Sequence, residues 1–313
     1  MDFIPEDQIL EFKPDTLDYI RRQYNLEKPG QMKESISILR DWVQKQNHFK
    51  VKDFSDRYYE MAIIACKGSI ERAKGQLDRV CTMRTLLPHF FTDWNIKTDF
   101  ASATEPVWTI LLPKLTDEHY RVEVVKFNNV PLHPSQNMEF FRSTIVLSEY
   151  IRAHDYMNGF LVIVDISEVK LVDILPKINL MYLRQALSIY IEGYGMRVKS
   201  IHLVTTSKVL DTLLAVIKQV MSPKIAGRVH IHKTMDEINE FVPKRILPKD
   251  YGGEERSIKE LYEEWLEVLT SDDHIKYMRD INEARTDEVY RQSDKFNEQC
   301  AGMPGTFRLL SID

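Results

Sequence analysis

The chain has 313 residues, 43% of them hydrophobic and 28% charged, which are ordinary values for a globular protein long enough for two domains. A net charge of −5 argues against a nucleic-acid-binding protein, and no apolar run approaches the roughly 18 residues of a membrane-spanning helix. Residues 1–7 lack the basic and apolar segments of a signal peptide, and the three cysteines have no metal-type spacing. We therefore expect reduced thiols in a cytoplasmic protein.

Residues 1–92 are expected to form an all-helical subdomain. Apolar residues recur there at spacings of three and four, which is the period of one helix face. The clearest stripes are Leu17, Ile20 and Tyr24, then Met32, Ile36, Leu39 and Val43, with further stripes in 58–64 and 70–87. Pro88 ends this region.

The pattern changes at about Trp108, where short apolar or alternating runs typical of strands begin. Helical periodicity separates these runs, so we predict an α/β sheet with some parallel pairing over residues 93–255. The expected strands are 108–112, 120–127, 160–165, 198–205 and a short one within 222–233. The expected helices are 138–153, 180–194 and 209–221.

After residue 255 the chain is expected to return to helix. Ser257 and Glu260 have the spacing of a capping box, and apolar Leu261, Trp265 and Leu269 follow. From residue 270 the sequence is polar and is expected to pack loosely. We therefore interpret 256–313 as a C-terminal helical extension and tail.

Motifs for catalysis and nucleotide binding are absent from the sequence. It contains no Gly-x-Ser-x-Gly elbow, no phosphate-binding lysine loop and no Gly-x-Gly-x-x-Gly. Asp165 is a candidate catalytic acid, but a hydrogen-bonded aspartate at a strand end is the interpretation we favour, and a hydrolase using it or Ser148 is a minor alternative. His230 and His232 share a strand face without further ligands nearby, so no metal site is predicted.

The segment 197–233 concentrates positive charge. It holds seven basic residues and one acid, so it carries +6 while the rest of the chain carries −11. This asymmetry favours a face that meets an anionic surface, although scattered solvated lysines are an equal alternative. The amphipathic helix predicted over 209–221 is either a surface helix packed on the sheet or a movable cover over an apolar cavity.

Four segments occur in an order that identifies a family: 159–165, 198–204, 222–232 and the Leu-Pro-x-x-Tyr-Gly-Gly of 247–253. On these the chain resembles the CRAL-TRIO (Sec14-like) lipid-binding family, in particular the animal group of tocopherol-transfer, retinaldehyde-binding and clavesin proteins. The resemblance covers about residue 30 to residue 253. The ending at 305–313 is similar to that of insect members. The chain departs from the family pattern in 61–69, where an arginine-rich run is replaced, and at Glu168, Gly195 and 205–207.

The resemblance implies a mixed sheet flanked by helices, a lid helix at 209–221 and a helical subdomain before them. It implies a soluble carrier rather than an enzyme, without a cofactor. Such a carrier binds one small hydrophobic ligand, such as a tocopherol, retinoid, carotenoid or phospholipid. We expect a monomer that touches anionic membranes peripherally and transfers the ligand between them. A non-transferring regulatory adaptor of the same fold is the alternative.

The resemblance also implies site residues. Thr144, Ser148 and Tyr190 would hydrogen-bond a hydroxyl or carbonyl of the ligand. The other ligand contacts would be Phe141, Ile145, Phe160, Val162, Ile189, Tyr194, Ile201, Leu210, Leu213, Leu214 and Ile217. Phosphoinositide contacts would fall on Arg197, Lys224 and Arg228.

Overall fold

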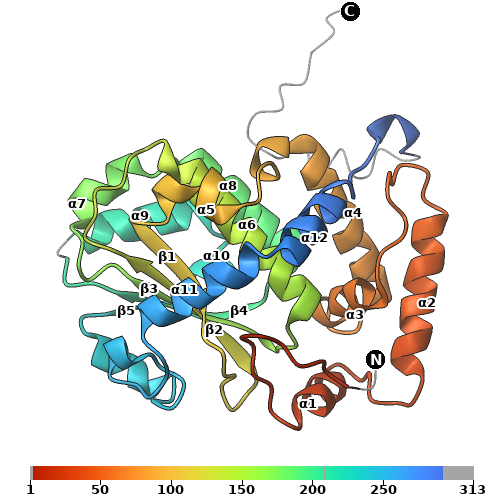
Figure 1. The fold of residues 1–313 in the computed structure, drawn as a ribbon, viewed down its shortest axis with the longest axis horizontal. Coiled ribbons are helices and arrows are strands. Elements are labelled where there is room, and N and C mark those ends of the chain that lie inside the picture. The colour runs from red at the N-terminus through yellow and green to blue at the C-terminus, as the bar shows by residue number, and fades with distance from the viewer. Residues whose placement is uncertain (1–2, 208, 292–313) are drawn as a thin grey trace, which may run out of the picture.

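A computed structural model describes residues 3–207 and 209–291, and its centre is a five-stranded mixed sheet (Figure 1). The strands lie side by side in chain order; the first pair is antiparallel and the other three pairs are parallel. Their bounds are β1 Val107–Leu111, β2 Tyr120–Phe127, β3 Gly159–Asp165, β4 Val198–Val204 and β5 Val229–His232. The predicted α/β sheet with partial parallel pairing is confirmed.

The N-terminal region is helical, as predicted. Ser55 and Ser69 cap two of its helices by accepting hydrogen bonds from backbone N–H groups of the first turn. Buried apolar residues of α2, α3 and α4 form one cluster, in agreement with the stripes seen in the sequence. The elements are α1 Thr16–Gln23, α2 Gln31–Gln44, α3 Asp56–Ala65, α4 Ile70–Leu86, η1 Pro88–Phe90, α5 Ile96–Asp99 and η2 Ala101–Ala103.

Helices connect the parallel strands. One prediction here was wrong in detail: the helix expected over 180–194 ends at Ser188 and continues as the π-helix η4 Ile189–Gly193. At this point the chain packs closely on α4, where a Cβ on Gly193 would lie 2.9 Å from Met83 Sδ. The elements are α6 Gln136–His154, α7 Leu171–Ile174, η3 Leu175–Lys177, α8 Leu180–Ser188, η4, α9 Leu210–Val220, α10 Pro223–Ala226, η5 Met235–Glu240 and η6 Lys249–Tyr251.

The C-terminal elements are α11 Ile258–Leu269, α12 Asp272–Asn282 and η7 Glu288–Tyr290. The helices α11 and α12 run across the molecule from the sheet toward the N-terminal helix α4 (Figure 1). The capping box of Ser257 and Glu260 is present. The expectation of loose packing from residue 270 was wrong as far as residue 291, because α12 buries His274 and Met278. The sequence of this helix is largely polar because few of its residues face the core, so hydrophobic periodicity does not predict its packing. The insect-type ending at 305–313 lies outside the described residues.

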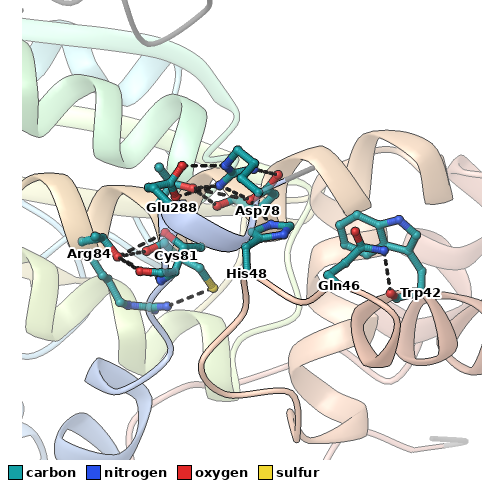
Figure 2. A network of polar contacts seen from close by, with 11 residues as sticks. Trp42, Gln46, His48, Asp78, Cys81, Arg84 and Glu288 are labelled. Carbon is teal, nitrogen blue, oxygen red and sulfur yellow. Dashed lines mark hydrogen bonds and ion pairs between the residues drawn. The ribbon is translucent and has the colours of Figure 1, made fainter. Parts of the chain in front are cut away.

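Polar contacts attach this C-terminal segment to the N-terminal helices (Figure 2). The carboxylate of Asp78 on α4 is hydrogen-bonded to His48 Nε2 at 3.0 Å and accepts a hydrogen bond from Arg291 Nη1 at 2.7 Å. Arg291 also donates to Glu288 of η7. The side chains of His48, Asp78 and Glu288 therefore meet, although their elements are far apart in the sequence (Figure 2). As far as residue 291, the C-terminal extension is consequently part of the folded body.

Candidate functional site

One face of the sheet is incompletely covered by the surrounding helices. Glu123 and Val125 of β2 lie in register with Val162 and Val164 of β3, and Val162 is in turn in register with Ile201 of β4. The first four side chains are half-buried, although their strands lie inside the sheet, and Ile201 is 8% exposed. Central positions of a sheet flanked by helices are normally fully buried. We call these five residues the open face.

Two predicted polar residues meet beside this face. The hydroxyls of Thr144 on α6 and Tyr190 on η4 are hydrogen-bonded to each other. The Thr144 hydroxyl also lies 2.8 Å from the carbonyl oxygen of Phe141, and the Tyr190 hydroxyl lies 3.4 Å from the same oxygen. Burial is the main cause that raises the pKa of Tyr190, and the charge of Glu123 contributes to it.

Glu123 is the residue that sequence reasoning missed. Its carboxyl has no hydrogen-bond or ion-pair partner in the part of the chain that the structure describes, and burial alone raises its pKa from 4.5 to about 7. Nearby charges are engaged elsewhere: Arg121 binds Asp155 at 2.8 Å through two nitrogens. The available signal was a glutamate in the middle of a strand that the resemblance places inside the sheet.

Three predicted ligand contacts lie in the core of the helical region. Phe141, Ile145 and Ile189 are 5%, 1% and 0% exposed and belong to the cluster built by α2, α3 and α4. Phe141 contacts the ring of Phe90 at a centroid distance of 6.4 Å. The structure thus joins Thr144 to Tyr190, and Tyr190 packs against the same cluster as these three residues. Val162 and Ile201 are neighbours in the sheet. Contact of the three core residues with a ligand stays a prediction.

Three further predicted contacts line a separate small cavity. Ser148, Phe160 and Tyr194 surround about 50 Å³ beside Arg197, together with residues of α3. This is room for only a few water molecules, since about 10–15 Å³ of such space is needed to hold one. The Ser148 hydroxyl donates to the carbonyl of Thr144 at 2.7 Å, and the Tyr194 hydroxyl donates to Glu149 at 2.7 Å. Both hydroxyls are therefore already used within the protein.

The predicted lid helix is α9, next to the carboxyl ends of β3 and β4. Leu213 is 9% exposed and belongs to a small apolar cluster with Leu203, Ile166 and Leu171, and Leu214 is half-buried. The side chains of Leu210 and Ile217 lie outside the described residues. The guanidinium of Arg184 on α8 donates to the carbonyl of Gln219 at 3.2 Å, which joins the two helices.

The three predicted phosphoinositide contacts gather at the amino-terminal edge of β4 and β5, in different environments. Arg197 is half-buried, donates to the carbonyls of Ile64 at 3.1 Å and Met157 at 3.4 Å, and lies over the ring of Tyr24. Burial lowers its pKa. Arg228 donates to the carbonyl of Val198, whereas Lys224 on α10 is exposed. Lys224 is thus the most accessible of the three.

The matches to known families agree with this architecture. Residues 107–253 match the family described as "CRAL/TRIO domain", and residues 28–100 match "Pinta-like, UBA domain". The chain thus contains a CRAL-TRIO domain over residues 107–253. This domain supports a lipid-binding carrier in general terms.

Relatives of this CRAL-TRIO protein include proteins named "Alpha-tocopherol transfer protein-like". The one from Mus musculus is 23% identical over 234 residues, which cover 72% of this chain and 66% of the relative. The one from Homo sapiens is 24% identical, with 72% and 67% covered. The chain thus matches about two thirds of their length. A solved structure described as "Crystal structure of Sfh5" aligns with a TM-score of 0.49 and 12% identity, covering 87% of this chain and 98% of that one.

The closing motif of the CRAL-TRIO domain seals the other face of the sheet. The Tyr251 hydroxyl donates to Asp165 at the end of β3 over 2.8 Å, and Asp165 also accepts from the Ser167 backbone at 3.0 Å. Gly252 has a positive φ of 72°, and a Cβ on Gly253 would collide with the carbonyl oxygen of Leu247. Asp165 is therefore the hydrogen-bonded strand-end aspartate that we favoured from the sequence.

The described ranges contain neither a cluster of metal-type ligands nor a helix that could span a membrane. No group of three or more His, Cys, Asp or Glu residues within 3–207 and 209–291 could hold a metal ion. His202 and His232 contact each other at 2.9 Å instead, and burial, with a smaller effect of the neighbouring histidines, lowers the pKa of His202 to about 4. No helix in these ranges is both long and apolar enough to cross a bilayer.

Proposed function

We propose that this protein is a carrier, not an enzyme, that binds one small hydrophobic molecule against the open face and beneath α9. The observation that carries the proposal is the partial exposure of Val125, Val162 and Val164 inside a sheet that helices flank. Apolar side chains left uncovered at such positions are the lining expected of a ligand site. The CRAL-TRIO domain supports the same class of function.

The energetics are adequate for a lipid ligand. Burying about 300 Å² of apolar ligand surface contributes about 7 kcal/mol before the costs of association, at roughly 25 cal/mol per Å². Such a gain extracts a lipid from a bilayer only when the shape of the site fits the ligand. The relatives named for tocopherol transfer make a tocopherol-sized molecule, a retinoid, a carotenoid or a phospholipid the range to test.

We also propose that the protein acts as a cytoplasmic monomer that docks peripherally on anionic membranes while α9 moves to admit the ligand. The exposure of Lys224 supports docking at the edge of β4 and β5. Phosphoinositide recognition would depend mainly on Lys224, because Arg197 and Arg228 already donate to carbonyl groups. The boundaries at residues 92 and 255 stay part of the proposal.

The alternative, a regulatory adaptor of the same fold, is favoured by one observation. Three predicted ligand residues, Ser148, Phe160 and Tyr194, surround only about 50 Å³. Native mass spectrometry of the gently purified chain separates the two. A co-purifying lipid in one-to-one ratio is expected for a carrier. A chain that carries no lipid and takes up no tocopherol, retinoid, carotenoid or phospholipid from vesicles would favour the regulatory adaptor over the carrier.

A further inference from the structure

Glu123 is the polar side chain on the open face that the protein itself does not use. It lies between Leu111 of β1 and Val162 of β3 in the register of the sheet, with Val125 two residues further along the same face. Its carboxyl has no protein partner among residues 3–207 and 209–291, and it is half-buried where its neighbours are apolar. A carboxyl in such a place is unfavourable for folding, and groups of this kind concentrate at functional sites.

The hydroxyls of Thr144 and Tyr190 offer no further hydrogen-bond donor to a ligand. Thr144 and Tyr190 each have one hydroxyl hydrogen, and three contacts join the two hydroxyls and the carbonyl of Phe141. Because the Thr144 hydroxyl donates to the carbonyl of Phe141, the Tyr190 hydroxyl is the donor in its contact with Thr144, and both hydrogens are used. Tyr190 therefore presents only oxygen lone pairs to a ligand, and an ionised Glu123 presents only acceptors as well.

The cationic side chains that could neutralise the charge of Glu123 form ion pairs with other carboxylates. Arg121, on the same strand face as Glu123, binds Asp155 through two hydrogen bonds of 2.8 Å. Lys126 pairs with Glu168 at 2.6 Å. A ligand with an anionic end would thus meet acceptors and a negative charge without a compensating cation among the described side chains. A ligand that donates a hydrogen bond would satisfy them.

We propose that Glu123 binds the polar end of the cargo, and that the cargo is an apolar molecule ending in a hydroxyl rather than a carboxylate or phosphate. This inference rests on the proposed carrier function. It deepens that function by naming the chemical class of the ligand, a lipid alcohol. The apolar remainder would lie along Val125, Val162 and Val164.

The test uses two ligands that differ only in their polar end. The full chain is loaded with the neutral apolar dye Nile red, which is displaced at pH 8 by 1-dodecanol or by dodecanoate. The wild type should prefer dodecanol by tenfold or more. Glu123→Gln, which adds a hydrogen-bond donor and removes the charge, should bind dodecanoate at least tenfold better while its affinity for dodecanol changes less than threefold.

The matched control is Glu192→Gln, which removes the same charge from an exposed position on η4. It should keep the preference of the wild type. Equal displacement by both ligands, or a preference that survives in Glu123→Gln, would overturn the assignment of Glu123. Failure of the wild type to take up Nile red or to release it to either ligand would instead refute the carrier function, so the two failures are distinguishable.

Discussion

The uncompensated carboxyl of Glu123 predicts a specific dependence of stability on pH. Its pKa is raised from 4.5 to about 7 in the folded protein, because burial disfavours the ionised form. The folded state then binds the proton more tightly than the unfolded state. The wild type therefore loses stability as the pH rises from 4.5 to 7, and the loss is complete above pH 7.

The magnitude follows from the shift. At about 1.4 kcal/mol per pKa unit, the ionised carboxyl lowers the free energy of unfolding by up to about 3 kcal/mol at pH 8 and by less than about 1 kcal/mol at pH 5. Glu123→Gln removes this dependence and should be more stable than the wild type at pH 8. Tyr190 stays neutral over this range because its own pKa is raised.

The assay is guanidinium unfolding of both proteins at several pH values between 5 and 8, followed by circular dichroism. The stability difference between Glu123→Gln and the wild type should grow by about 2 kcal/mol across this range, as the linkage relation requires. Glu192→Gln, with its exposed side chain, serves as the control and should follow the wild type. Parallel pH profiles for Glu123→Gln and the wild type would refute the reasoning.

Three further substitutions test other parts of the structure. Arg84→Ala leaves Glu149 buried without its 2.5 Å ion pair and should lower the free energy of unfolding by about 3–5 kcal/mol. The control Arg40→Ala breaks an exposed ion pair and should lower it by less than about 1 kcal/mol. Equal losses in guanidinium unfolding would contradict this prediction. Tyr251→Phe removes one buried hydrogen bond and should cost about 1–2 kcal/mol in the same assay, and an unchanged midpoint would show that the closing motif does not depend on it. Lys224→Glu should weaken sedimentation with anionic vesicles about tenfold, since each basic residue near such a surface contributes about 1 kcal/mol; unaltered binding would remove the docking role.

Much of the fold could be predicted because its elements have a clear period. The helical stripes before residue 92 and the strand runs after residue 107 reappear within one or two residues of their expected bounds. The π-helix at Ile189–Gly193 and the helix at Asp272–Asn282 could not be foreseen in the same way. The first lies where Gly193 packs closely on Met83, and the second buries only a few side chains. Both are decided by tertiary packing and not by local pattern.

The site was harder to predict than the fold. Phe141, Ile145 and Thr144 are neighbours on α6, and periodicity alone cannot tell which side of a doubly buried helix meets the sheet and which meets the helical region. Glu123 was overlooked because its alternation with Arg121 looks like that of a solvent-facing strand. Only the pairing of β2 with both β1 and β3 shows that it lies inside the sheet.

This double burial of α6 changes how the domains should be viewed. Its Phe141 and Ile145 complete the apolar core of the N-terminal helices, while Val146 and Leu147 pack in the cluster of the sheet and α11. Glu149, on the same helix, accepts hydrogen bonds from Arg84 of α4 and from Tyr277 of α12. The helix beside the open face is thus positioned by the N-terminal and C-terminal regions together. The matched segment 107–253 contains the sheet, but the flanking helices define the shape of the site.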